Sequence, residues 1–193
     1  MACVKLNNTQ IQLKNTQEEL KETKRKLEEK VDILENKLMQ FPGVHTWKIT
    51  DFSEVMKRAK SGEQTQIRSA PFYEHGYKFR LSLSPNGQSS GKNTHVSIFF
   101  VLMKGEYDAI LSWPLDEKVT FTLIDQQRNP NDRENISNTA DPKKDQECFM
   151  RPVEDENTGC GFPRFVSHKK LNERHYVVDD TVFIQIKVLF QSK

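Results

Sequence analysis

Residues 77–83 read YKFRLSL, and this stretch decides the fold class. Apolar or aromatic side chains alternate with polar ones, as in a β-strand with one buried and one exposed face. Residues 119–124 and 182–190 repeat this alternation, and residues 95–103 read as a strand covered on both faces. Because turn signals separate these runs and no βαβ rhythm is present, residues 42–193 are predicted to form a mainly β, antiparallel β-sandwich.

Smaller features of this region lead to further expectations. Residues 53–60 and 168–172 each suit one or two helical turns. Residues 125–148 contain no aromatic residue and one large aliphatic residue, so we expect a mobile surface loop there. The adjacent Asp179 and Asp180 are expected to cap a turn or form a salt bridge.

The N-terminal stretch, residues 1–41, has a heptad repeat instead. No Gly or Pro precedes Pro42, so this stretch has no helix breaker, and its lack of aromatic residues other than Phe41 argues against a globular core. Apolar residues at every seventh position predict a long left-handed α-helical coiled coil, about 57 Å in length. The predicted oligomerisation residues are Leu6, Leu13, Leu20, Leu27, Val31, Leu34, Leu38 and Phe41.

One alternative for residues 1–41 is a single amphipathic helix docked on the sandwich. A docked helix normally has a wider apolar stripe than a coiled-coil seam. The many charged side chains between residues 18 and 26 leave little room for such a stripe. Self-association is therefore preferred, which divides the chain into a coiled coil at 1–41 and a sandwich at 42–193.

Composition excludes several classes of protein. Lys and Arg number 29 against 27 Asp and Glu, and this near balance argues against a dedicated nucleic-acid binder. No apolar run is long enough for a membrane helix, and the first residues lack a signal-peptide core. Cys3, Cys148 and Cys160 are odd in number and widely spaced, so neither a disulfide framework nor a cysteine-rich zinc site is expected. These features favour a reducing, cytoplasmic location without membrane insertion.

The sequence contains no recognisable catalytic motif. It lacks H-E-x-x-H, P-loop, G-x-G-x-x-G and G-x-S-x-G patterns. Cys160 and His168 form a nucleophile pair only if folding joins them, and residues 159–161 read as a glycine-rich turn. Asn135 begins a glycosylation sequon, which matters only in a secreted protein. We therefore predict no catalytic residue, no metal site and no cofactor.

Several longer strings are much more specific. They are HTWKI at 45–49, SAPFY at 69–73, THVSIFF at 94–100, MKGEYD at 103–108, GFPRF at 161–165 and YVVDDTVFI at 176–184. Their order and density resemble the C-terminal domain of the tumour necrosis factor receptor-associated factors, a branch of the MATH fold. The resemblance covers residues 42–193, and the family also carries a coiled coil before this domain.

The resemblance implies an eight-stranded antiparallel sandwich at the end of a coiled coil that is usually trimeric. Family members bind short extended tails of receptors or adaptor proteins along a sandwich edge, by strand addition. Three copies on one trimer bind clustered tails more tightly through effective concentration. Catalysis in the family belongs to RING and zinc-finger domains before the coiled coil, and this chain contains neither.

Carried over by position, the resemblance also predicts the peptide-binding residues and shows departures from the family pattern. Ser82 and Ser84 stand where the family has an arginine and a tyrosine, and Gln88 replaces an aspartate. Residues 146–148 replace three serines that hold a ligand glutamine. A ligand different from the family's glutamine-and-acid motif is therefore expected. The predicted site comprises Phe99, Ser82, Ser84, Gln88, Gln146, Glu147, Cys148, Gly159, Cys160, Gly161, Phe162 and Pro163.

The leading hypothesis is a trimeric cytoplasmic signalling adaptor. Two alternatives stay open at this point. The chain could be a MATH module that recognises substrates for ubiquitin ligation, because the same fold serves both uses. It could also be a secreted trimeric recognition protein with β-sandwich heads.

Overall fold

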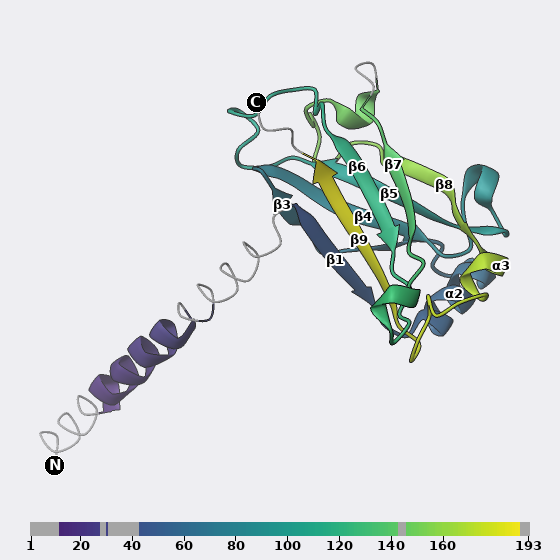
Figure 1. Ribbon diagram of the computed structural model, residues 1–193. Coiled ribbons are helices and arrows are strands. Elements are labelled where there is room, and N and C mark those ends of the chain that lie inside the picture. Colours follow the sequence, from purple (N-terminus) through teal and green to yellow (C-terminus); the bar gives the residue numbers. More distant parts are fainter. Residues whose placement is uncertain (1–11, 28–29, 31–42, 143–145, 190–193) are drawn as a thin grey trace, which may run out of the picture. The chain divides into compact units, whose positions relative to one another are not determined.

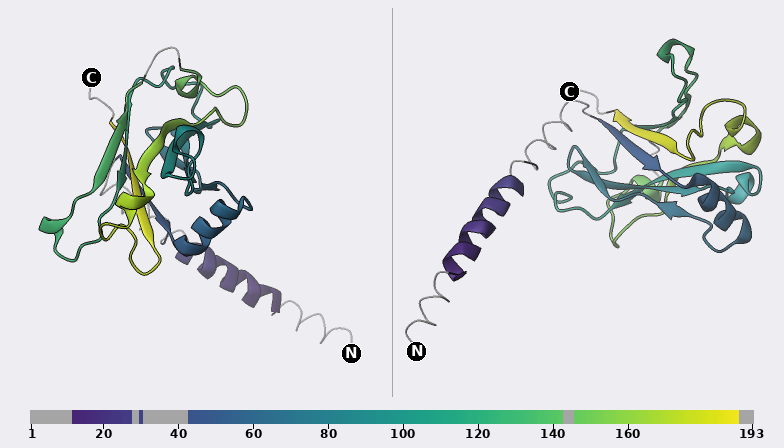
Figure 2. Two further views of the ribbon diagram at one scale, coloured as in Figure 1. Left: turned by 90° about the vertical axis from the view of Figure 1, so that its right-hand side faces the viewer. Right: turned by 90° about the horizontal axis from the view of Figure 1, so that it is seen from below.

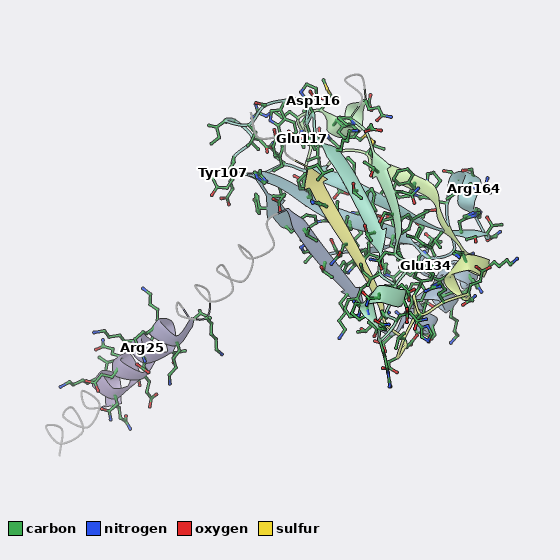
Figure 3. All side chains as sticks on the ribbon, in the orientation of Figure 1. Arg25, Tyr107, Asp116, Glu117, Glu134 and Arg164 are labelled. Carbon is green, nitrogen blue, oxygen red and sulfur yellow. A yellow bond between two sulfur atoms is a disulfide. The ribbon has the colours of Figure 1, made fainter. Side chains whose placement is uncertain are left out.

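The computed structural model describes residues 12–27, 30, 43–142 and 146–189. The chain divides into two compact units, Met1–Pro42 and Gly43–Lys193. In the first unit, residues 12–27 form a helix, and Leu13, Leu20 and Leu27 are 61%, 69% and 62% exposed. Arg25, labelled in Figure 3, projects from this helix and donates to Glu22 over 2.8 Å. The remaining predicted oligomerisation residues, Leu6, Val31, Leu34, Leu38 and Phe41, lie outside the described residues.

The second unit consists of two antiparallel sheets, drawn as separate layers in Figures 1 and 2. One sheet has the order β1 (Val44–Ile49), β9 (Val182–Leu189), β6 (Lys118–Leu123) and β7 (Ile136–Ala140). The other has the order β2 (Ile67–Arg68), β4 (Tyr77–Ser84), β5 (His95–Met103) and β8 (Cys160–Ser167), with β3 (Phe72–Glu74) also paired to β4. The expected antiparallel β-fold is therefore present, and the four predicted strands correspond to β4, β5, β6 and β9.

Over the described residues there are nine strands, where the sequence analysis expected eight. β2 and β3 both pair with β4, so they lie along the same edge of that strand. Between them the Ser69 hydroxyl, rather than a backbone carbonyl, accepts the Leu81 amide over 2.9 Å. Pro71 has no amide hydrogen to donate. This edge of β4 is therefore paired in two short pieces.

The core lies between the two sheets and is rich in aromatic residues. Phe79 of β4, Phe100 of β5 and Phe121 of β6 are fully buried. The ring centroids of Phe100 and Phe121 lie 6.3 Å apart, so these side chains join one sheet to the other. The alternation that predicted β4 thus places its aromatic face inside and its polar face outside.

Short helices close the ends of the strands. α2 (Phe52–Ser61) and α3 (His168–Leu171) coincide with the two predicted helical turns. The Asp180 carboxylate accepts hydrogen bonds from the Ser53 amide at 2.7 Å and the Ser53 hydroxyl at 2.8 Å, which confirms its expected capping role. The 3-10 helices are η1 (Ser89–Gly91), η2 (Pro130–Asp132) and η3 (Glu147–Phe149). No helix among those described has both the length and the apolarity that a membrane crossing requires.

The expected mobile loop at 125–148 is wrong for most of its length. β7 forms within it and pairs with β6, where hydroxyl pairs such as Thr120–Thr139 at 2.9 Å add to the backbone ladder. Asp125 is fully buried and accepts hydrogen bonds from the Glu134 amide and from Arg174 Nε, the latter over 2.7 Å. Polar interactions order this segment, and an apolar count cannot reveal them.

The same interactions set the charge state of Asp125. Burial by itself would raise the pKa of this carboxyl. The hydrogen bonds from the Glu134 amide, Arg174 and the Gln127 amide outweigh burial and hold the pKa below its ordinary value. Asp125 is thus a buried, charged anchor that ties the β6–β7 connection to Arg174, between α3 and β9.

Candidate peptide-binding groove

A hollow of about 390 Å³, here called the polar groove, lies on the outer face of the five-stranded sheet. Its floor comes from β4 and β5. Residues of β2 lie on one side, and the segment that leads into β8 lies on the other. The residues that line it are Gln66, Arg68, Ser82, Gln88, Phe99, Val101, Glu156, Asn157, Thr158 and Gly159.

The strand period explains why these side chains meet. Ser82 of β4 is the antiparallel partner of Phe99 of β5, and Arg80 is the partner of Val101. Cross-strand partners point to the same face of a sheet, so all four face away from the core. The floor of the polar groove therefore follows from the same alternation that buries Phe79.

A glycine allows β8 to approach β5 at this point. Gly161 pairs with Phe99, and a Cβ at Gly161 would stand 2.1 Å from the Ile98 carbonyl oxygen. Pro163, which cannot donate a backbone hydrogen bond, is tolerated because β8 is the last strand of its sheet. Its carbonyl accepts the Ser97 hydroxyl over 2.6 Å. Among the described residues no strand pairs with the other side of β8, so β8 is an edge strand beside the polar groove; it begins at Cys160, and Gly159 precedes it.

The groove floor contains an unsatisfied polar atom. Ser82 is only 3% exposed, and among the described residues its hydroxyl has no hydrogen-bond partner. A buried hydroxyl without a partner loses its hydration without compensation. Because this oxygen is itself buried, a ligand in the polar groove could bond it only after the side chains that cover it move.

An ion pair crosses the groove. Arg68 Nη1 from β2 lies 2.9 Å from Glu156 Oε1 on the opposite side, and Arg80 Nη1 lies 3.6 Å from Glu156 Oε2. Gln66, Gln88 and Asn157 contribute neutral amides. The groove is therefore lined mainly by hydrogen-bonding groups, which suits an extended polar peptide more than an apolar ligand.

The predicted site residues divide into three groups. Ser82, Gln88, Phe99 and Gly159 line the polar groove together. Ser84 is buried two residues after Ser82 in β4 and pairs with Ser97. Gly161 and Pro163 lie in β8, next to β5. Phe162 points inward, with its ring centroid 6.0 Å from that of Phe121.

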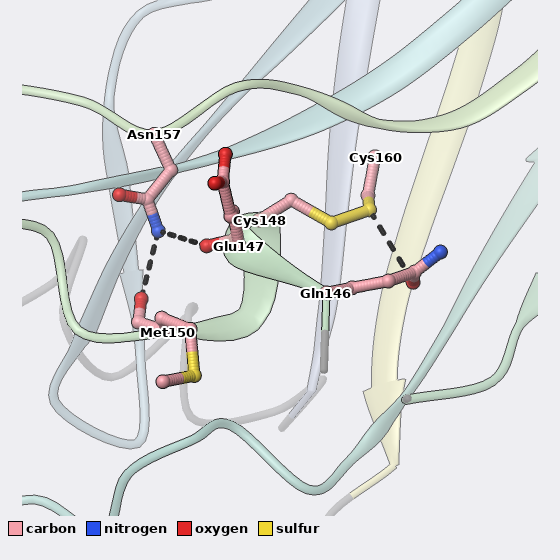
Figure 4. Close-up of a disulfide and its surroundings, with 6 residues drawn as sticks. All are labelled: Gln146, Glu147, Cys148, Met150, Asn157 and Cys160. Atoms are coloured by element: carbon pink, nitrogen blue, oxygen red, sulfur yellow. Dashed lines mark hydrogen bonds between the residues drawn. A yellow bond between two sulfur atoms is a disulfide. The ribbon is translucent and has the colours of Figure 1, made fainter. Parts of the chain in front are cut away.

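The third group surrounds η3 (Figure 4). Cys148 and Cys160 form a disulfide, so the expectation of no disulfide is wrong. Their Cα atoms lie 5.8 Å apart because η3 and the start of β8 are neighbours in the fold, which spacing along the chain cannot show. Cys160 also begins a strand rather than lying in a turn. Gln146 Oε1 lies 3.8 Å from its sulfur.

Asn157 links η3 to the groove. Its side-chain amide donates to the Glu147 carbonyl at 3.1 Å and to the Met150 carbonyl at 2.7 Å (Figure 4). The exposed Glu147 therefore supports the groove through its backbone, and its carboxylate is not among the lining groups.

The sequence analysis missed the charged residues of the groove. Arg68 and Glu156 are 88 positions apart, and no local pattern connects them. Arg80 was visible in principle, because it shares the outer face of β4 with Ser82 at a spacing of two. Within the described residues, no group of three or more His, Cys, Asp or Glu side chains is placed to hold a metal ion.

Comparisons with known proteins agree with this architecture. The sequence pattern of the MATH domain matches residues 44–188. Human TNF receptor-associated factor 2 is 41% identical over 156 residues, which cover 79% of this chain and 30% of that protein. Mouse TNF receptor-associated factor 1 is 41% identical over 149 residues, or 75% of this chain and 36% of that protein. The chain thus spans about a third of the length of these relatives.

A solved structure gives the same result. TRAF5 from Notothenia coriiceps superimposes with a TM-score of 0.74 and 28% sequence identity, covering 94% of this chain and 95% of the other. The matched region contains both sheets and every residue of the polar groove. The chain therefore belongs to the MATH-domain family, and the TNF receptor-associated factors are its homologues.

Proposed function

We propose that this chain is the ligand-binding and self-associating part of a signalling adaptor that acts in the cytoplasm in TNF receptor pathways. It binds short extended tails of receptors or adaptor proteins in the polar groove and along the free edge of β8. The observation that carries this proposal is the polar groove on the outer face of the sheet, beside that edge. Backbone hydrogen bonds would supply affinity, and the groove side chains would supply specificity.

The N-terminal helix completes the proposal. Leu13, Leu20 and Leu27 form an exposed stripe with heptad spacing, which a partner helix would bury. We propose a homotrimer, in which three weak tail-binding sites act together on clustered receptors. The chain itself acts as a binding protein and not as an enzyme.

A peptide array tests tail binding directly. Overlapping segments of receptor and adaptor tails are probed with the full chain, and the strongest segment is then N-methylated one amide at a time. Strand addition predicts that methylation at alternate residues abolishes binding while the amides between them tolerate it, because successive amides of a strand point to opposite sides. Uniform tolerance of methylation would rule out strand addition.

A groove variant tests the location of the site. Phe99→Ala removes half of the apolar floor and should lower affinity about tenfold or more, since a buried aromatic contact contributes about 1.5–3 kcal/mol. Leu189→Ala at the end of β9, on the other sheet, is the control and should leave affinity unchanged. Equal effects of the two variants would contradict this placement.

Helix variants test self-association. Leu13→Glu with Leu20→Glu places charge in the proposed seam, whereas Gln12→Glu with Asn15→Glu adds the same charge outside it. Light scattering should give three chains for the wild type and the control, and one chain for the seam variant. A wild type that scatters as a monomer of 22.5 kDa would refute the assembly.

The Cys148–Cys160 disulfide favours a second candidate function, a secreted trimeric recognition protein, because disulfides persist in oxidising compartments. Asn135 is exposed and begins a glycosylation sequon, so secretion would permit a glycan there. Mass spectrometry of the protein from its natural cells separates the two functions. A glycan at Asn135 with an intact disulfide supports secretion, and free thiols without a glycan support the cytoplasmic adaptor.

A further inference from the structure

A second hollow continues the polar groove along the outer face of β4. It has a volume of about 510 Å³ and shares Arg68 and Glu156 with the polar groove. We call it the cationic hollow, because four of its lining residues are basic. Its charged residues are Arg68, Lys78, Arg80, Lys104, Asp155 and Glu156.

Positive charge in this hollow exceeds negative charge by two. Arg68 and Arg80 share the single carboxylate of Glu156, and Arg80 Nε otherwise donates to the Met103 sulfur, a weak acceptor, over 3.1 Å. Within the described part of the chain, the hydrogen bond that Lys104 Nζ makes is to the Val153 carbonyl, at 3.5 Å. These cations retain donor capacity that no carboxylate of the hollow uses.

The cations remain accessible to a ligand. The Arg68 side chain is 47% exposed, that of Arg80 is 21% exposed, and that of Glu156 is 29% exposed. A partly buried guanidinium is the group that best holds a carboxylate or phosphate, because its planar donors bind two oxygens at once. The exposure of Arg68 and Arg80 therefore permits direct contact with an anion.

The position of the hollow determines where an anionic ligand group would lie. Arg80 and Lys78 precede Ser82 by two and four residues on the outer face of β4, so they are about 7 and 13 Å from it along the strand. An extended peptide has the same spacing, with alternate side chains about 7 Å apart. A peptide with one residue over Ser82 could thus present anionic residues to Arg80 and Lys78.

We propose that the cationic hollow binds an anionic part of the same extended peptide, bearing about two negative charges beside the residue over Ser82. This inference rests on the proposed function, because it assumes a peptide in the polar groove. Two acidic residues at alternate positions supply such a charge, and so does one phosphorylated side chain. The anion competes with Glu156 for Arg68 and Arg80.

Charge-series peptides form the test. The strongest neutral segment from the array is synthesised with an added end group, first at one end and then at the other. The end groups are Glu-Ser-Glu, phosphoserine, Gln-Ser-Gln and Lys-Ser-Lys. Fluorescence polarisation measures the affinity of each peptide for the full chain. We expect the Glu or phosphoserine version at one end to bind about tenfold more tightly than the Gln version, and the Lys version to bind more weakly. This gain should shrink between about 50 mM and about 300 mM salt.

Three variants tie the effect to named residues. Lys78→Gln with Arg80→Gln, at two residues that line the cationic hollow but not the polar groove, should abolish the gain while leaving the Gln peptide's affinity unchanged. Glu156→Gln should increase the gain in affinity about threefold, because it frees the guanidinium groups of Arg68 and Arg80. If Glu156 had only a structural role, the same variant should decrease the gain. Arg128→Gln, which removes an exposed arginine between β6 and η2, is the control for loss of positive charge outside the hollow and should change nothing. Thermal melts check that each variant is folded.

The outcomes separate this inference from the proposed function. If neutral peptides bind and anionic ends add nothing, or if the gain survives loss of both Lys78 and Arg80, the cationic hollow has no such role and the proposed function stands. If no segment binds at any charge, both fall. An oligonucleotide of matched charge is compared with unlabelled Glu peptide as a competitor for the bound Glu peptide. Equal displacement by the two competitors would overturn selective peptide recognition by the hollow. Whether Glu or phosphoserine binds more tightly identifies the source of the anion.

Discussion

Reducing the Cys148–Cys160 disulfide should destabilise the sandwich by about 3 kcal/mol. The bridge closes a loop with a sequence separation of 12, and the loss of loop-closure entropy in the unfolded chain scales with the logarithm of that length. Reduction leaves both sulfur atoms in place, so it changes the constraint while removing little packing around the buried Cys148. With a urea m-value of about 2 kcal/mol/M, the unfolding midpoint should fall by about 1.5 M.

The assay is urea unfolding of the full chain with and without dithiothreitol. Cys160→Ser should unfold at the midpoint of the reduced wild type and should no longer respond to the reductant. Cys3→Ser, which removes the third cysteine, should keep the full response. The reasoning is refuted if reduction leaves the wild-type midpoint unchanged, or if Cys3→Ser loses the response.

Three further predictions concern stability. Hydrogen bonds hold the pKa of Asp125 below its ordinary value of 3.8, so the stabilisation that Asp125 provides above that pH should be lost as the pH falls through its lower folded-state pKa. Urea unfolding at several pH values should show that Asp125→Asn loses less stability in acid than the wild type, and equal losses of stability would contradict this reading. Gly161→Ala forces a Cβ against the Ile98 carbonyl and should reduce the free energy of unfolding by about 1–3 kcal/mol and weaken peptide binding. If urea unfolding and peptide affinity are both unchanged, β8 can move away from β5. Phe121→Ala should cost about 3–5 kcal/mol in calorimetry, because its fully buried ring joins the two sheets, and a loss below about 1 kcal/mol would indicate that the core collapses to fill the space.

Much of the architecture was predictable because it depends on local periodicity. A spacing of two predicts Phe79 inside and Ser82 outside, and the same alternation predicts β6 and β9, whereas a continuous apolar run predicts β5. The segment at 125–148 was mispredicted because backbone pairing with β6 and the buried Asp125 order it. Such polar order has no signature in hydrophobicity.

The candidate site was predictable only in part, for a related reason. The outward residues of β4 and the edge position of β8 follow from strand alternation and from the family resemblance. The Arg68–Glu156 pair and the Cys148–Cys160 bridge each join residues from separate elements, so only tertiary structure decides them. Local pattern determines which face of a sheet a side chain occupies. The packing of strands distant in sequence determines which side chains meet on that face, because a hydrogen bond or disulfide depends on distances that no single element sets.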